Sequence, residues 1–187
     1  MRTAEEPPGW QRVDSVVEHT NPWFSVYSDH AIRPDGSAGR YFHVRSTGSV
    51  TLLATDAEQR ILFTRQWIYT HGSRQWRLPS GAIDPGDVDA KAAARRELRE
   101  ETGLRAGSLT VLNVLHGCDS FTNHVDHLFH ATDLSEGTAD LEGGEADLRL
   151  AWIPFDEAVK MARDGDVPHG PSAFAVLALA AKRWDCP

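Results

Sequence analysis

The amino-terminal part of the chain has the mixed apolar and polar spacing that is typical of β-strands. Residues 10–45 are β-rich: residues 23–32 carry Phe24, Val26 and Ile32, a Pro-Asp-Gly turn follows, and residues 41–45 run back. This pattern predicts an N-terminal antiparallel β extension over residues 10–45. Residues 1–9 are polar and contain proline, and they are predicted to form a flexible tail.

Short apolar runs bounded by polar residues predict further strands along the rest of the chain. These runs are residues 49–55, 61–67, 109–116, 125–131 and 148–153. The first two are joined by a short, mostly polar segment around residues 56–59, so they are predicted to form a strand pair. The alternation of such runs with helical segments predicts an α/β (α+β) fold, and we find no internal repeat.

Two of the segments with helical periodicity have predicted caps. The first is predicted to begin at a cap formed by Asp87 or Asp89 and to end at Gly103. The last helix of the chain is predicted over residues 173–184, with Ser172 as its cap. Its predicted buried stripe consists of Phe174, Leu177, Ala178 and Ala181.

Bulk properties narrow the class of protein. The 187 residues are enough for one domain with a substantial core, and the net charge of −8 argues against nucleic acid as a partner. The two cysteines, Cys118 and Cys186, are too few for a disulfide framework. No run of apolar residues has the length of a signal peptide core or a membrane span. The sequence therefore predicts a soluble, cytoplasmic protein without a membrane partner.

The first of the two helices carries three glutamates on one face. Steps of three and four residues place Glu97, Glu100 and Glu101 about 5–6 Å apart at Cβ. At about 6 Å and an effective dielectric of about 20, each like-charge pair costs about 3 kcal/mol. Mg²⁺ or Mn²⁺ would turn this repulsion into binding, because both prefer carboxylate oxygens together with water and substrate phosphates. The alternative is a solvated acidic face paired with Arg96 and Arg99.

The stretch around these glutamates resembles the Nudix box, G-x5-E-x7-R-E-U-x-E-E-x-G-U, in which U is aliphatic. The second half matches at every specified position: Arg96, Glu97, Leu98, Glu100, Glu101, Gly103 and Leu104. In the first half, fourteen residues separate Gly81 from Arg96 where the pattern has thirteen, and the early acidic position corresponds to Asp87 with a shift of one residue. The loop before the helix can absorb the additional residue.

The resemblance to the Nudix family implies the architecture. We expect a Nudix-type α/β/α sandwich with a central mixed sheet, as one domain over residues 10–187 in which residues 46–187 form the Nudix fold. The N-terminal extension resembles that of the ADP-ribose pyrophosphatase-like branch, where this sheet pairs two subunits. That likeness implies a homodimer, and it implies that Trp23 and Tyr27 stack on a base. Alternatively, both are ordinary strand aromatics.

The resemblance also implies a set of roles at the metal site. The implied ligands of one to three Mg²⁺ or Mn²⁺ ions are Glu97, Glu100, Glu101 and the backbone carbonyl of Ser80. Arg96 is expected to orient the glutamates. In the related branch a glutamate from a later loop activates the attacking water. Here that loop is residues 133–147, with Glu145 as the first candidate and Glu142 as the second. The alternative is a loop that is acidic and merely solvated.

Two further stretches bear on the substrate. Arg65 begins an RQW stretch that resembles the R-Q-Y-R stretch of the ADP-ribose group, with Ile68 where the second arginine is usual. Arg77 begins an RLPSG stretch that ends in Gly81 and resembles E-L-P-A-G, with arginine in place of the glutamate. We expect Arg65, Arg77 and Gly81 to contact substrate, the arginines as phosphate forks. The alternative for each arginine is a surface charge.

Taken together, the resemblance implies a metal-dependent hydrolase. Its partner would be a small molecule in which a nucleoside diphosphate is linked to another group X, such as ADP-ribose or another nucleotide sugar. One alternative is a non-catalytic nucleotide-binding or sensor module of the same fold. Another is an isopentenyl-diphosphate isomerase, which needs a catalytic cysteine and a histidine metal cluster, and for which Cys118 and His116 are the candidates.

Overall fold

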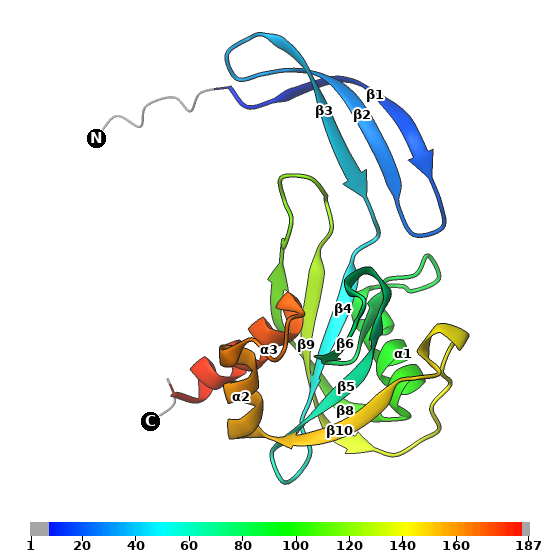
Figure 1. Ribbon diagram of the computed structural model, residues 1–187, viewed down its shortest axis with the longest axis vertical. Coiled ribbons are helices and arrows are strands. Elements are labelled where there is room, and N and C mark those ends of the chain that lie inside the picture. Colours follow the sequence, from blue (N-terminus) through cyan, green and yellow to red (C-terminus); the bar gives the residue numbers. More distant parts are fainter. Residues whose placement is uncertain (1–7, 185–187) are drawn as a thin grey trace. The chain divides into compact units, whose positions relative to one another are not determined.

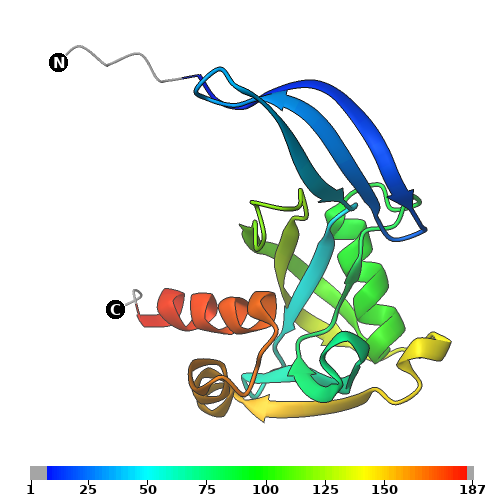
Figure 2. The same ribbon diagram turned by 45° about the horizontal axis from the view of Figure 1, so that its top comes forward.

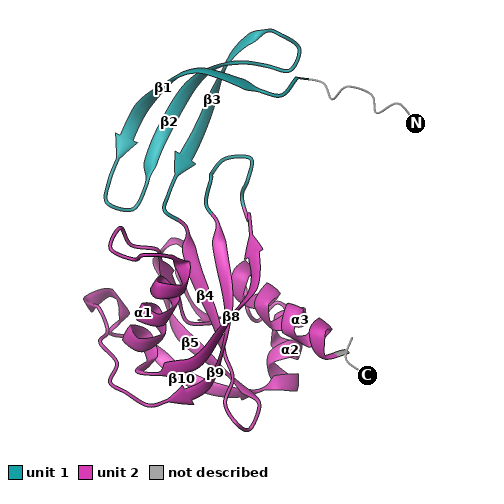
Figure 3. Ribbon diagram, turned by 180° about the vertical axis from the view of Figure 1, so that it is seen from behind, with its two compact units in different colours: residues 1–47, 118–124 teal, residues 48–117, 125–187 magenta. Residues whose placement is uncertain are grey.

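The computed structural model describes residues 8–184 and divides the chain into two compact units. One consists of Met1–Thr47 and Cys118–His124, and the other of Gly48–Gly117 and Val125–Pro187 (Figure 3). Most of the tail predicted over residues 1–9 lies outside the described residues. The single domain predicted over residues 10–187 stays a prediction.

The first unit is a three-stranded antiparallel sheet in the order β1-β2-β3 (Figure 1). Its strands are β1 Gln11–Thr20, β2 Ser25–Ile32 and β3 Ala38–Arg45. The predicted N-terminal β extension is therefore confirmed. All ten residues of β1 are exposed, and the buried residues of the sheet are only Ser28, Asp29 and Ala31 among those that the structure describes. By itself this sheet buries almost no apolar core.

The second unit contains two sheets and all three α-helices. One sheet has the order β7-β4-β9-β8 and the other has the order β10-β5-β6. The strands are β4 Ser49–Ala54, β5 Arg60–Ile68, β6 Ser73–Arg77, β7 Ser80–Ala82, β8 Arg105–Leu115, β9 Asp126–Ser135 and β10 Arg149–Pro154. The helices are α1 Ala90–Thr102, α2 Phe155–Asp164 and α3 Gly170–Trp184, with short 3-10 turns η1 Tyr69–His71 and η2 Gly143–Glu145. No helix within residues 8–184 has the length and apolar content needed to cross a membrane.

The four-stranded sheet is mixed, because β4 runs parallel to β9 and its other pairs are antiparallel. Successive side chains of a strand point to opposite faces. Leu52 accordingly joins a core cluster with Leu98 of α1, whereas Leu53 joins a second cluster with Val176 of α3. Burying each leucine contributes about 1.5–3 kcal/mol. Helices thus cover both faces (Figure 2), which confirms the predicted α/β/α sandwich with a central mixed sheet.

The predicted strands at residues 49–55 and 61–67 exist as β4 and β5, but the prediction that they pair is wrong. A single bridge between Thr55 and Ile61 joins them. Beyond that bridge, β5 pairs with β6 and β10 in the other sheet. The reason is that β4 has no free edge, since β7 occupies one side and β9 the other.

The prediction for the last helix is also wrong in detail. Helix α3 begins three residues before the predicted start, and the Ser172 hydroxyl accepts a hydrogen bond from the Leu78 amide at 2.9 Å instead of capping the helix. Phe174 and Leu177 are 38% and 39% exposed. The buried side chains are Ala175, Val176, Leu179 and Ala180. Because this segment is apolar nearly all around, its pattern does not fix which side faces the core.

Candidate active site

Helix α1 carries Glu97, Glu100 and Glu101, which we call the acidic cluster. Local signals fix both ends of the helix. The Asp89 carboxylate accepts a hydrogen bond from the amide of Ala92 at 2.7 Å, so Asp89 is the N-cap and Asp87 is not. Gly103 ends the helix with φ 74°, a left-handed conformation that favours glycine, and donates to the carbonyl of Arg99. The additional residue relative to the box pattern is therefore absorbed before Ala90, in the loop after β7.

Two of the three glutamates are buried where α1 meets β7. Glu97 is 8% exposed and Glu101 is 4% exposed. The Ser80 amide donates a hydrogen bond of 2.9 Å to Oε2 of Glu101. A Cβ added to Gly81 would lie 2.1 Å from Cδ of Glu97, so only glycine leaves room for this carboxylate. Glu100 is half-buried and forms an ion pair with Arg96 at 3.1 Å.

Arg96 holds the acidic cluster to the preceding loop. Its guanidinium donates to the Asp87 carboxylate at 2.9 and 3.2 Å and to the Ala82 carbonyl at 2.9 Å. It also donates to Glu97 at 2.7 Å and to Glu100 at 3.1 Å. The hydrogen bond to Asp87, more than any other contact, raises the pKa of Arg96 above its ordinary value. Asp87 thus holds the guanidinium of Arg96 in place. The sequence did not predict this role, because Asp87 is shifted by one residue from the acidic position of the box.

The two buried carboxylates hold their protons unusually strongly. Burial raises the pKa of Glu101 to about 8, and the negative charges of Glu97 and Glu145 contribute to the increase. Burial likewise raises the pKa of Glu97 to about 6, against the lowering effect of Arg96. Near neutral pH, burial and mutual repulsion therefore disfavour a negative charge on both carboxylates at once. A cation between the two carboxylates would offset this cost.

Glu145, the first loop candidate, lies close to the acidic cluster. It ends η2, and its charge raises the pKa of both Glu97 and Glu101. Its carboxylate accepts a hydrogen bond from the Glu142 amide at 3.1 Å, and the two glutamates form a reciprocal capping box around η2. The second candidate, Glu142, is thereby engaged in holding the turn that presents Glu145.

The acidic cluster fits a hard divalent cation that is shared with substrate. Within residues 8–184, no three or more His, Cys, Asp or Glu side chains converge into a complete metal site. Mg²⁺ commonly takes one or two carboxylates and completes its shell with water and substrate phosphates. Glu97 and Glu101 supply such a pair, and the glycine at residue 81 leaves their carboxylates space that a side chain would fill. The oxygen donors suit Mg²⁺ or Mn²⁺.

Arg77 lies in a nearby pocket of about 420 Å³. Its Nε atom is buried and has no hydrogen-bond partner among the described residues. Desolvation lowers the pKa of Arg77, while the negative charges of Glu101 and Asp126 act in the opposite direction. The pocket is lined by Ile68, Thr70, His71, Gln75, Arg77, Pro168, His169 and Gly170. A partly buried arginine with an unused donor thus lies beside the acidic cluster.

Comparison with known proteins decides the family. Residues 45–173 match the NUDIX domain, and residues 10–44 match the nucleoside diphosphate sugar hydrolase N-terminal domain. The chain belongs to the Nudix family. It is accordingly a hydrolase of diphosphate linkages, as the sequence predicted.

Several relatives cover most of the Nudix chain. The ADP-ribose pyrophosphatase of Mycobacterium tuberculosis is 31% identical over 173 residues, which cover 92% of this chain and 84% of the relative. The ADP-ribose pyrophosphatase of Bacillus subtilis is 26% identical, with 84% and 85% covered. The GDP-mannose pyrophosphatase of Pectobacterium atrosepticum is 26% identical, with 78% of each chain covered. A solved ADP compounds hydrolase has the same fold, with a TM-score of 0.81 at 20% identity and coverage of 97% and 96%.

The remaining predicted contacts of this Nudix protein are described by their own surroundings. Arg65 stacks on Trp76, with Cζ 5.3 Å from the ring centroid, and no hydrogen bond in the described chain joins it to the acidic cluster. Trp23 is 75% exposed and belongs to the other unit, in the turn between β1 and β2. The ring of Tyr27 stacks on His43 at 5.4 Å and also carries the Arg45 guanidinium at 4.3 Å. The faces of Tyr27 are therefore already engaged by its own unit.

Proposed function

We propose that this Nudix hydrolase cleaves ADP-ribose or another nucleotide sugar between its two phosphates, with Mg²⁺ or Mn²⁺ as cofactor. The observation that carries the proposal is the pair of buried carboxylates, Glu97 and Glu101, pressed against β7. The relatives are named for two nucleotide sugars, ADP-ribose and GDP-mannose. Both substrates present a diphosphate with an organic group on each side, and the products would be two phosphorylated fragments.

The residues of the acidic cluster would divide the work as follows. Glu97 and Glu101, assisted by Glu100 and the Ser80 carbonyl, would hold the metal. When bound, the ion would offset negative charge on the diphosphate oxygens and lower the pKa of a coordinated water. Arg96 positions Glu97 and Glu100 through its four hydrogen-bond partners. Glu145 accepts the proton of the attacking water, because its turn presents it near both buried carboxylates.

Arg77 is the proposed phosphate contact. Its half-buried guanidinium lines the pocket of about 420 Å³, and arginine presents forked donors that match phosphate oxygens. The nearby Glu101 and Asp126 offset part of the cost of keeping this charge away from water. Arg65, Gly81 and Trp23 stay proposed substrate contacts on the strength of the family resemblance alone.

The decisive experiment is a substrate panel with Mg²⁺ or Mn²⁺, containing ADP-ribose, GDP-mannose, dinucleoside polyphosphates and oxidised nucleotides. We expect the highest kcat/KM for a nucleotide sugar. Glu101→Gln should lower kcat by about 10³-fold while the fold is retained, whereas the exposed control Glu157→Gln should not change kcat. Activity near wild type in Glu101→Gln would contradict the proposal. Tight nucleotide binding without turnover at any metal concentration would instead favour the sensor module.

We also propose that the protein is a homodimer in the cytoplasm, with the sheet of the first unit at the interface. The support is the fully exposed β1, in which Val13 is 65% and Val17 is 52% exposed. A strand with such apolar exposure and almost no core of its own commonly pairs with another surface. Replacing both valines with lysine should give a monomer in light scattering, whereas Val88→Lys, at a loop residue that is 90% exposed, should not. Cell fractionation would test the location.

A further inference from the structure

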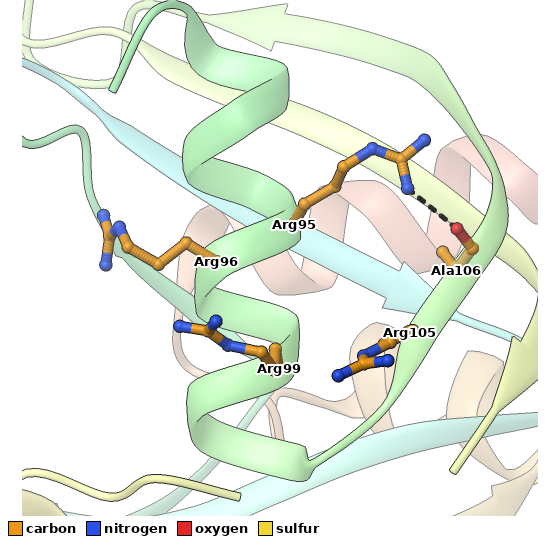
Figure 4. A pocket seen from close by; sticks show the side chains of 5 residues that line it. All are labelled: Arg95, Arg96, Arg99, Arg105 and Ala106. Carbon is orange, nitrogen blue, oxygen red and sulfur yellow. Dashed lines mark hydrogen bonds between the residues drawn. The ribbon is translucent and has the colours of Figure 1, made fainter. Parts of the chain in front are cut away.

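One hollow of the second unit is lined almost entirely by arginine side chains. It has a volume of about 590 Å³ and lies beside α1 and the start of β8 (Figure 4). Its lining residues are Arg95, Arg96, Arg99, Arg105 and Ala106. We call it the arginine hollow. Four cationic side chains within eleven residues are unusual in a chain whose net charge is −8.

The arginine hollow and the acidic cluster share Arg96, but Arg95 and Arg99 lie on a different side of α1 from Glu97 and Glu101. Each residue of an α-helix turns about 100° around the axis, so residues two apart lie about 200° apart. Arg95 therefore lies nearly opposite Glu97, and Arg99 lies nearly opposite Glu101. Figure 4 shows that the Arg95 side chain points toward Ala106, whereas the Arg96 side chain points to the other side of the helix.

The positive charge of the hollow is only partly neutralised. Arg96 is taken up by the acidic cluster, and Arg99 donates to Glu100 at 2.7 Å. Arg95, in contrast, donates only to the carbonyl of Ala106, at 2.8 Å. Arg105 makes no hydrogen bond or ion pair with any residue between 8 and 184. Arg95 and Arg99 also repel each other as an i,i+4 pair of like charges.

We propose that the arginine hollow binds the phosphate dianion of a small molecule. Arginine presents its donors as a planar fork that matches phosphate oxygens, and two such forks are uncommitted to any carboxylate. The volume lies within the range of small-ligand pockets. A long polyanion such as nucleic acid is disfavoured by the net charge of −8. This site does not depend on the substrate assigned to the acidic cluster.

The test is calorimetric titration of the metal-free protein in EDTA with inorganic phosphate and, separately, with ribose 5-phosphate at constant ionic strength. We expect saturable binding of one ligand per chain. The tighter of the two ligands identifies the source, either free phosphate or a phosphate ester. The double variant Arg95→Gln/Arg105→Gln should weaken binding about tenfold or more, since it removes two charge-assisted contacts. Arg149→Gln is the matched control, because Arg149 also donates to one backbone carbonyl at 2.8 Å.

Two further variants make the outcome unambiguous. The single variant Arg105→Gln loses no hydrogen bond or ion pair within the described chain, so its fold should be intact and its binding should still be weakened severalfold. The variant Glu101→Gln should bind phosphate as wild type does, because no hydrogen bond or ion pair in the described chain joins Glu101 to the arginines of the hollow. The proposal is overturned if neither ligand binds, if the arginine variants bind like wild type, or if binding is lost only in the glutamate variant.

Discussion

The Glu97 carboxylate occupies the space into which any side chain at Gly81 would extend. The hypothetical Cβ of residue 81 would lie 2.1 Å from Cδ and 2.2 and 2.3 Å from the two carboxylate oxygens. The glycine at the head of the box therefore does not serve a special backbone angle. It allows β7 to approach α1 closely enough that Ser80 reaches Glu101 and Arg96 reaches the Ala82 carbonyl.

Gly81→Ala should consequently damage activity more than folding. We expect the added methyl group to displace the Glu97 carboxylate and to lower kcat/KM by about 10²-fold, because small displacements of a catalytic group have effects of that size. Gly86→Ala is the control, since nothing lies within 4 Å of a Cβ at residue 86. Steady-state kinetics on both variants checks the expectation. Equal activity of the two variants would show that Glu97 need not hold its position.

Arg96 and Arg99 are three residues apart but should differ sharply on substitution. Arg96→Gln leaves the carboxylates of Asp87 and Glu97 without their ion-pair partner, which should cost about 3 kcal/mol of unfolding free energy and most of the activity. Arg99 is 48% exposed and pairs only with Glu100, so Arg99→Gln should cost less than about 1 kcal/mol. Urea denaturation in EDTA measures both values. Similar losses for the two variants would refute the assignment of Arg96 as the positioning residue.

Removing the metal should make Glu101 a source of instability. Its pKa is raised from 4.5 to about 8, so the folded state disfavours the charged form. The contribution of Glu101 to the stability of the metal-free protein is therefore fully present below pH 4.5 and is lost as the pH rises through about 8. Above pH 8 in EDTA, Glu101→Gln should exceed wild type by about 2 kcal/mol, since each tenfold change in proton affinity corresponds to at most about 1.4 kcal/mol and solvent screens part of it.

Excess Mg²⁺ supplies the internal comparison for this prediction. Wild type should gain unfolding free energy with increasing Mg²⁺ because the ion binds only the folded state, and Glu101→Gln should gain much less. The exposed control Glu157→Gln should follow wild type with and without the ion. A wild-type protein that is insensitive to both EDTA and Mg²⁺ would argue against a metal at Glu101.

The features that the sequence predicted correctly are those determined by local chemistry. Helix α1, the cap at Asp89 and the stop at Gly103 each depend on residues within one or two turns. The common face of Glu97 and Glu101 follows from helical geometry alone. The approach of Glu145 to these carboxylates was anticipated only by analogy, and the charge effects on Glu97 and Glu101 are consistent with it.

The features that the sequence missed depend on distant partners. Strand pairing was mispredicted because both edges of β4 are taken, one by β7 and the other by β9, which lies more than seventy residues away along the chain. Ser172 was interpreted as a helix cap, yet its hydroxyl accepts a hydrogen bond from the amide of Leu78, which lies 94 residues earlier in the chain. The burial of Arg77 has no local signal either, because the residues around it come from β6, η1 and the start of α3.

His169 should give the protein an acid sensitivity that is separate from the carboxylates. Burial lowers its pKa to about 4, and the positive charge of Arg77 contributes in the same direction, whereas Asp126 opposes it. Its Nδ1 lies 2.7 Å from the Ser172 hydroxyl, which holds the Leu78 amide. Protonating the His169 ring would therefore place a second positive charge beside Arg77, where the start of α3 meets Leu78.

The sign of the effect follows from linkage. The unfolded chain binds a proton on His169 near pH 6.5 and the folded chain only near pH 4, so folding loses free energy as the pH falls through that window. His169→Gln should flatten the dependence of unfolding free energy on pH between about 7 and 4, on the order of 2 kcal/mol after allowance for partial exposure. The exposed His71→Gln, in the same pocket, should leave the dependence as in wild type. Urea denaturation in EDTA across this range is the measurement, and parallel curves for wild type and His169→Gln would rule out His169 as the origin of acid lability.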